Sequence, residues 1–155
     1  MKSHSQTPLF QKSEEIFETL KNITALFPKE NEILMELKNQ LMENAITIQA
    51  KLTGAYAVKL YDLKMENATL IRKAAREILV LHHGLEMHGF KEVEYYQIVR
   101  NQIEEFRLLF IAWVTEFNQQ HFITDSWGLF NPPGISPDHE QSEDELDFLD
   151  EDDEE

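Results

Sequence analysis

The sequence contains no cysteine and only five glycines among its 155 residues. Without cysteine, the chain cannot form disulfides, bind metals through thiolates or use a thiol nucleophile, and it fits a reducing compartment. Because glycine is scarce and hydrophobic residues make up 42% of the chain, the composition favours a globular helical protein over a disordered one. At this length we expect one domain with its own core.

Long apolar runs are also missing. The longest uninterrupted run, LLFIAWV, has seven residues, whereas a membrane-spanning helix needs about 20. The opening residues, MKSHSQTPLFQKSEE, have no apolar core segment after the lysine, which argues against a secretory signal. We therefore expect a soluble, cytoplasmic protein that has no membrane partner.

Basic residues are absent from the last eighteen positions. All fourteen Lys and Arg residues precede residue 138, whereas twelve of the 29 acidic residues lie at 138–155. That segment therefore carries −12, and the residues before it, with seventeen acidic groups, carry −3. The distribution predicts a nearly neutral domain with an acidic tail. It disfavours direct binding to nucleic acid and favours a basic partner.

Apolar residues recur at helical spacing through most of the chain. Ser13, followed by two glutamates, predicts the start of a first helix, which Pro28 ends. A second stripe begins near Glu30, and a third ends at Gly89, a favourable C-terminal stop. The last helix begins near Lys91. Its stripe is the most regular in the chain: Tyr96, Val99, Ile103, Phe106, Phe110, Trp113 and Phe117.

The two middle stripes meet near Gly54, where two interpretations remain open. A bend or tight turn there predicts an all-α fold, an antiparallel four-helix bundle over 13–121 after a flexible segment at 1–12. Alternatively, because glycine costs a helix only about 1 kcal/mol, one helix could run from 30 to 88. That helix would be about 88 Å long, too long for a small domain, and would favour a homodimer.

Residues 122–137 have no helical period. Their two glycines and three prolines predict an irregular segment. Trp127 and Phe130 would each gain about 1.5–3 kcal/mol from burial, which favours docking of this segment on the bundle. In the alternative interpretation they form an exposed aromatic hook. Trp127 and Phe130 are therefore candidate partner-binding residues.

Three of the six histidines lie within LHHGLEMHGF at 81–90. His82 and Glu86 are one helical turn apart, and together with His88 they could hold a divalent metal such as zinc or manganese. Their directions do not converge unless the helix unwinds, and histidines near a helix C-terminus are favoured by the helix dipole without any function. The sequence therefore favours solvated or capping histidines over a metal site, and predicts no other cofactor.

The tail at 138–155 has too little apolar content to fold alone, which predicts disorder. Leu146, Phe148 and Leu149 nevertheless stand among the acidic residues of EDELDFLDEDDEE. Acidic groups supply long-range attraction and apolar groups an anchoring contact, so these three are also candidate partner-binding residues. Two targets fit: a basic protein, or the chain's own basic helix face around 72–76.

Catalytic motifs are missing as well. The sequence has no glycine-rich phosphate loop, nucleophile elbow or zinc-protease motif, so no catalytic residue is predicted. The leading hypothesis is a non-enzymatic helical interaction, adaptor or regulatory protein whose acidic tail engages a basic partner. The alternatives are a metal-binding bundle protein or enzyme that uses the histidine cluster, and a structural homo-oligomer.

Overall fold

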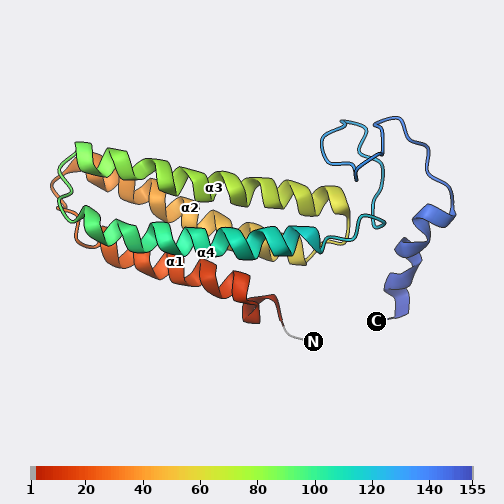
Figure 1. Cartoon of the computed structure of the whole chain (residues 1–155), viewed down its shortest axis with the longest axis horizontal. Helices are drawn as coiled ribbons and strands as arrows, with labels where there is room; N and C mark the ends of the chain where they lie inside the picture. The colour runs from red at the N-terminus through yellow and green to blue at the C-terminus, as the bar shows by residue number, and fades with distance from the viewer. Residues whose placement is uncertain (1–2, 155) are drawn as a thin grey trace.

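The computed structural model describes residues 3–154, with side chains through Glu151. Within that range the chain is all-helical and contains no strand, which confirms the predicted fold class at this level. The four α-helices lie side by side, and we call them the helical body (Figure 1). The elements are η1 (His4–Gln6), α1 (Pro8–Thr24), α2 (Glu32–Tyr56), α3 (Tyr61–Met87), η2 (Val93–Tyr95), α4 (Tyr96–Thr115) and η3 (Asp144–Glu154), where η denotes a 3-10 helix.

Helix α1 begins earlier than the sequence predicts. Thr7 caps it by accepting a hydrogen bond from the Phe10 amide at 3.3 Å, and Pro8 occupies the first helical position, where an N–H is not needed. Ser13, the predicted cap, is buried inside the helix and donates to the carbonyl of Phe10. The segment predicted to be flexible at 1–12 therefore overlaps α1 from residue 8 onward, while residues 1 and 2 lie outside the described residues.

Helices α2 and α3 are separate, which confirms the break expected near Gly54. Helix α2 ends at Tyr56 and α3 begins at Tyr61. A Cβ at Gly54 would lie 3.2 Å from Oδ1 of Asn67, so the glycine lets the two helices approach closely beside the turn. A single helix from 30 to 88 is therefore wrong, and the argument for a homo-oligomer that rested on its length no longer holds.

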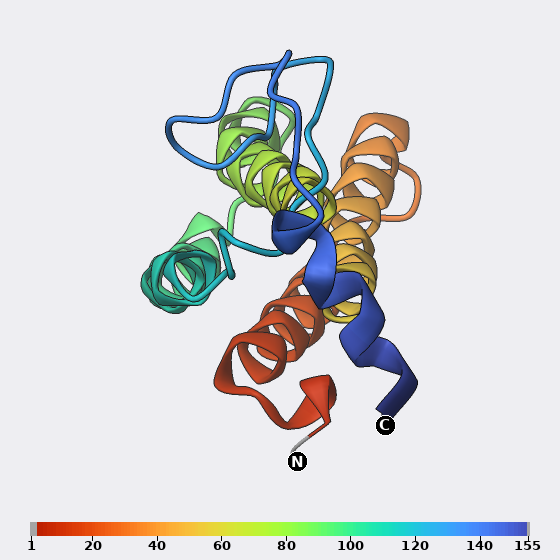
Figure 2. The ribbon, with the colours of Figure 1, turned by 90° about the vertical axis from the view of Figure 1, so that its right-hand side faces the viewer.

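The core lies between the four helices. Seen from one end, the helices stand around a common centre in the order α1, α2, α3, α4 (Figure 2). Helix α3 packs mainly on α2, and α4 packs mainly on α1. The most deeply buried apolar side chains are Ile16, Leu20, Leu34, Leu41, Ile48, Leu52, Ile71, Ile78, Leu85, Tyr96 and Val99. None of the helices within residues 3–154 combines the length and apolar character needed to cross a membrane.

One end of the helical body, here called the histidine end, is closed by the C-terminus of α3. Gly89 adopts a φ of 94°, which favours glycine and ends the helix. The Phe90 amide then donates to the carbonyl of Leu85 at 3.0 Å. The Phe90 ring turns inward and meets Phe27 with ring centroids 4.8 Å apart. An aromatic pair in the core therefore holds this end together.

The opposite end, here called the acidic end, is covered by the chain that follows α4. This chain folds over the start of α3, and η3 crosses the end of the helical body (Figures 1 and 2). The Tyr61 amide donates to the carbonyl of His121 at 2.8 Å. Phe148 is only 7% exposed and its ring stacks on His121 with centroids 4.8 Å apart. The tail predicted to be disordered therefore contains a helix, because Phe148 finds a ring on which to pack.

Candidate functional site

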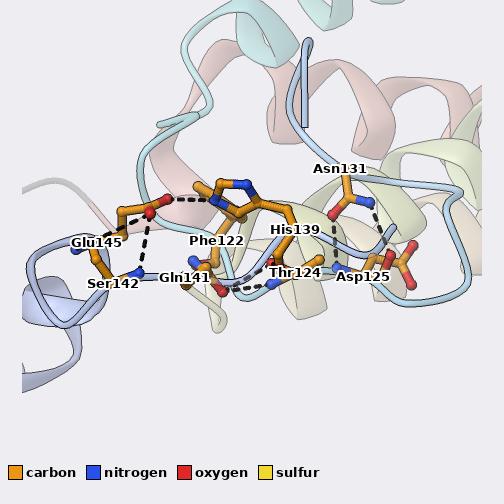
Figure 3. A network of polar contacts seen from close by, with 8 residues as sticks. All are labelled: Phe122, Thr124, Asp125, Asn131, His139, Gln141, Ser142 and Glu145. Carbon is orange, nitrogen blue, oxygen red and sulfur yellow. Dashed lines mark hydrogen bonds and ion pairs between the residues drawn. The ribbon is translucent and has the colours of Figure 1, made fainter. Parts of the chain in front are cut away.

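At the acidic end, residues 122–124 are hydrogen-bonded to residues 139–141, which lie much later in the sequence (Figure 3). The Thr124 amide donates to Oε1 of Gln141 at 2.8 Å, and Nε2 of Gln141 donates to the carbonyl of Phe122 at 2.7 Å. The Thr124 hydroxyl donates to the carbonyl of His139 at 3.0 Å. One glutamine amide thus satisfies two backbone groups, which fixes the irregular segment against the residues that precede η3.

A tight loop after Thr124 is organised by the Asp125 carboxylate. Its oxygens accept hydrogen bonds from the backbone amides of Trp127, Leu129 and Phe130 at 3.0, 3.0 and 2.9 Å. These bonds, that of the Phe130 amide first, lower the pKa of Asp125 below its ordinary value of 3.8. The Asp125 amide in turn donates to Oδ1 of Asn131 at 2.7 Å (Figure 3). The loop backbone is thereby held in one conformation.

This loop at 125–131, here called the Trp127 loop, presents apolar side chains to solvent. Trp127 is 89% exposed and Leu129 is 75% exposed, whereas Phe130 is half-buried. Gly128 between them adopts a φ of 73°, which permits the turn. Of the two partner-binding residues predicted in the irregular segment, the structure therefore places Trp127 in solvent and Phe130 partly inside.

The start of η3 is attached through Glu145. Its Oε2 lies 3.0 Å from Nε2 of His139, and its Oε1 accepts a hydrogen bond from the Ser142 amide at 3.2 Å (Figure 3). The His139 side chain, followed by the Ser142 amide, lowers the pKa of Glu145 below its ordinary value of 4.5. An ionised carboxylate therefore connects η3 to the residues that precede it.

The three apolar residues predicted to anchor the tail have different surroundings. Phe148 lies inside, almost parallel to the His121 ring at an angle of 14°. Leu146 is half-buried, and Leu149 is 44% exposed. One of the three is thus used for packing within the chain, while Leu149 stays accessible to another molecule.

A groove of about 590 Å³ lies between η3 and the irregular segment, and we call it the end groove. Four of its lining side chains are acidic: Asp144, Glu145, Asp147 and Glu151. Five are apolar: Phe122, Pro132, Pro133, Ile135 and Phe148. A lysine or arginine can pack its aliphatic stem on such a floor while its charge meets the carboxylates. The end groove therefore has the chemistry to hold a cationic side chain.

At the histidine end, His82, His83 and Glu86 each bring one ligand atom to within 4.8 Å of the others. Nε2 of His82 lies 3.6 Å from Oε1 of Glu86. Zinc, with bonds of about 2.0–2.2 Å, holds neighbouring ligand atoms roughly 3.5 Å apart. The donor types suit a divalent metal, but these side chains would have to move closer together to share one ion.

His88 lies outside this group, although it is one of the three predicted ligands. It is the C-cap residue of α3, and its backbone carbonyl accepts a hydrogen bond from Nδ2 of Asn31 at 3.0 Å. Asn31 also caps α2 through its Oδ1, which accepts from the Leu34 amide at 3.1 Å. The structure thus assigns His83, rather than His88, to the cluster with His82 and Glu86, because the helix ends before His88 can share their face.

The side chain of His82 also packs as a core residue. Its ring stacks on Tyr96 with centroids 5.1 Å apart, and its Nδ1 is buried without a hydrogen-bond partner among the described residues. The Tyr96 hydroxyl donates to the carbonyl of Ile78, and burial raises the pKa of this phenol above its ordinary value of 10.0. The packing of His82 therefore has a structural cause that requires no metal.

Sequence reasoning did not single out the residues that organise the acidic end. The run from Asp125 to Gly128 carries a turn signal, since aspartate bonds its own backbone two residues on and glycine permits the turn. Gln141 and His139 give no such signal, because their partners are brought near only by the fold. The chain matches no protein-family model, no curated protein and no solved structure.

Proposed function

We propose that this chain is a non-enzymatic interaction protein, an antiparallel four-helix bundle whose acidic end binds a basic segment of a partner protein. The observation that carries the proposal is the end groove, where four carboxylates line one side of an apolar floor. Apolar contact supplies affinity, and complementary charge supplies orientation and a faster encounter. A basic segment with at least one apolar side chain has both features.

The Trp127 loop offers the same partner a second contact. Exposed tryptophan is a frequent source of binding energy in interfaces. Three hydrogen bonds from backbone amides to the Asp125 carboxylate fix the loop before binding, so little conformational entropy is lost when the partner binds. Trp127 and Leu129 would bury their exposed rings and methyl groups on an apolar patch of the partner.

The charge of the tail narrows the partner's class. Residues 138–155 carry −12, so they repel nucleic-acid phosphates and attract proteins with exposed lysine and arginine. A nucleic-acid-binding protein presents such a surface, and the acidic end would then occupy its phosphate site. Binding of this kind weakens as salt screens the exposed charges.

Calorimetry of the full chain tests the proposal with a synthetic peptide of alternating lysine and leucine, and with a twin peptide that has glutamate for lysine. We expect the lysine peptide to bind at the end groove and the glutamate twin not to bind there. The variant Asp144→Asn/Asp147→Asn/Glu151→Gln should weaken binding of the lysine peptide about tenfold or more, about 1.4 kcal/mol.

The matched control removes the same charge from the helical body, in Glu14→Gln/Glu18→Gln/Glu43→Gln. All three side chains are exposed. This variant should bind the lysine peptide nearly as well as the original chain. Equal weakening in both variants would mean that net charge alone attracts the peptide, and the end groove would lose its role.

A second candidate function, binding of a divalent metal, is favoured by the convergence of His82, His83 and Glu86. It is tested by elemental analysis of protein purified without a histidine tag and then by titration with Zn²⁺. A stoichiometric ion that is lost in His82→Ala and kept in His88→Ala would support it. An equal loss in both variants, or no ion at all, would reject it.

A further inference from the structure

A second groove runs along the seam between α3 and α4, on the side of the helical body. Because α3 packs mainly on α2 and α4 mainly on α1, these two helices leave a space of about 290 Å³ between them. We call it the α3–α4 groove. Its lining residues are Arg72, Ala75, Arg76, Leu79, Ile103, Phe106, Arg107, Phe110 and Ile111.

The floor of this groove is apolar and follows helical spacing on both walls. On α3, Ala75 and Leu79 are one turn apart. On α4, Phe106 and Phe110 are one turn apart, and Ile111 beside them is 47% exposed. From residue 72 to residue 79 the wall is about 10 Å long, the rise of two helical turns. A helix bound along it could insert side chains from positions i, i+3 or i+4, and i+7.

The rim of the groove is basic. Arg72, Arg76 and Arg107 all line it and all are exposed. Arg107 is bonded by two nitrogens to the Glu104 carboxylate, with Nε at 2.9 Å. Arg72 and Arg76 form no ion pair with another described side chain. Two guanidinium groups, each able to bind a carboxylate with two parallel hydrogen bonds, are therefore available above an apolar floor.

We infer that the α3–α4 groove binds an acidic amphipathic helix of another protein. Its apolar side chains would enter the groove at three points over two turns, and its flanking carboxylates would meet Arg72 and Arg76. The charge of the rim selects an acidic segment over a basic one, and the length of the floor suits a helix. This surface differs from the acidic end in both position and sign.

The chain's own tail has similar chemistry but occupies another place. Phe148 is buried against His121 at the acidic end, so its ring would have to leave that contact to reach the groove. An external helix needs no such rearrangement. With a basic segment on the end groove and an acidic helix on the α3–α4 groove, one copy of the chain would connect two partners of opposite charge.

The probe is a fluorescent twelve-residue peptide with leucine and phenylalanine on one helical face and glutamate elsewhere. Its twin has lysine in place of every glutamate. We expect the full chain to bind the glutamate peptide, and Arg72→Glu/Arg76→Glu to bind it at least about tenfold more weakly. Because the end groove is proposed to hold lysine side chains, the lysine twin is tested in a chain that also carries Asp144→Asn/Asp147→Asn/Glu151→Gln. In that background Arg72→Glu/Arg76→Glu should gain affinity for the lysine twin, so a folded, charge-reversed groove gives a positive signal. An unfolded variant would bind neither peptide, which circular dichroism would reveal.

Two further variants separate the groove from general charge effects. Lys73 is on the same helix but outside the groove, where its side chain is 71% exposed and its Nζ lies 4.0 Å from Oε1 of Glu77. The variant Lys73→Glu should therefore keep nearly full affinity for the glutamate peptide. Ile111→Glu places a carboxylate on the floor at an exposed position and should abolish binding of the glutamate peptide. Equal loss in Lys73→Glu and in the Arg72/Arg76 variant, or full binding by Ile111→Glu, would overturn the proposal.

Competition experiments with the full chain test which molecule binds the α3–α4 groove. A peptide of residues 138–155 should displace the glutamate probe at least about tenfold less effectively than unlabelled probe does. Equal displacement would assign the groove to the tail of the same or a second copy, and would overturn binding of an external helix. Displacement of the probe by decanoate at similar concentration would assign it to a fatty acid instead, with the same consequence.

Discussion

The two ends of the helical body both carry histidines, and the histidines do different things there. At the histidine end, His82 and His83 lie on one helix, and His82 packs on the core residue Tyr96. At the acidic end, His121 and His139 lie on separate stretches and each contacts η3, one through Phe148 and the other through Glu145. The two adjacent histidines thus lie near the end of one helix, whereas the two that are distant in sequence hold η3 in place.

The two ends of the helical body also differ in the contacts that hold them together. The histidine end is closed by apolar packing of Phe27 and Phe90, both 3% exposed, and by the C-terminus of α3, where the carbonyls of Leu85 and Glu86 accept hydrogen bonds from the amides that follow. The acidic end is held by hydrogen bonds to the carboxylates of Asp125 and Glu145 and by the buried rings of Phe122 and Phe148, which lie outside the main core cluster. Segments with few buried apolar contacts open more readily than the core. We therefore expect the acidic end to be the less stable of the two, and the predictions below test this difference.

The largest effect on the free energy of unfolding is expected from Phe90→Ala. Removing a buried phenylalanine from the core costs about 3–5 kcal/mol, through lost burial and the cavity that remains. Chemical denaturation of the whole chain, followed by circular dichroism at 222 nm, measures this loss. A loss below about 1 kcal/mol would mean that the Phe27–Phe90 pair does not hold the histidine end.

A smaller effect is expected from the matched change at the acidic end, Phe148→Ala. The ring packs on His121, and a stacked pair of this kind contributes about 0.5–1.5 kcal/mol beyond simple burial. We expect the helical body to keep nearly its full unfolding free energy, while amide hydrogen exchange in 144–151 becomes much faster. A global loss as large as that of Phe90→Ala would remove the distinction between the two ends.

A pH-dependent release of η3 is the next effect in size. The folded-state pKa of Glu145 is lowered below 4.5, so the attachment is stabilised at pH above 4.5 and this contribution disappears as pH falls through the lowered pKa. NMR signals of residues 142–148 should therefore shift toward those of a released segment as the pH falls below 4.5. In Glu145→Gln this step should be absent. Its persistence would assign it to other carboxylates.

The smallest effect on global stability is expected from Asp125→Ala. The change removes the acceptor of three backbone amides in the Trp127 loop, so exchange of those amides should accelerate about tenfold or more. The melting temperature should change little, because the loop covers little of the core. Asp138→Ala is the matched control, since its carboxylate bonds only the hydroxyl of Ser136 among the described side chains. Equal acceleration in the control would contradict the role of Asp125.

The regular parts of the fold could be predicted because helical periodicity is a local property. The first half of the last predicted stripe, from Tyr96 to Phe106, is buried as its spacing predicts, and Gly89 ends α3 as a glycine with positive φ should. The start of α1 was misplaced because Ser13 resembles a cap, although Thr7 and Pro8 cap the helix better. Local signals of similar strength compete, and only the packed structure decides between them.

The candidate site could be predicted only in part. Phe148 and its acidic neighbours were identified from composition, since apolar residues among acids are conspicuous. The groove that they line depends on His121 and Gln141, whose contacts join residues far apart in the chain. His88 was chosen by proximity in sequence, and it lies beyond the end of the helix that carries His82. Convergence in space thus requires the tertiary fold.

The central claim, that the acidic end binds a basic segment, is tested most directly by amide hydrogen exchange of the full chain with and without saturating lysine–leucine peptide. We predict slower exchange at 119–122, 134–135 and 144–151, which surround the end groove, and unchanged exchange along α3 and α4 beside the second groove. Protection at the α3–α4 groove instead, or no protection at any of these segments, would contradict the claim.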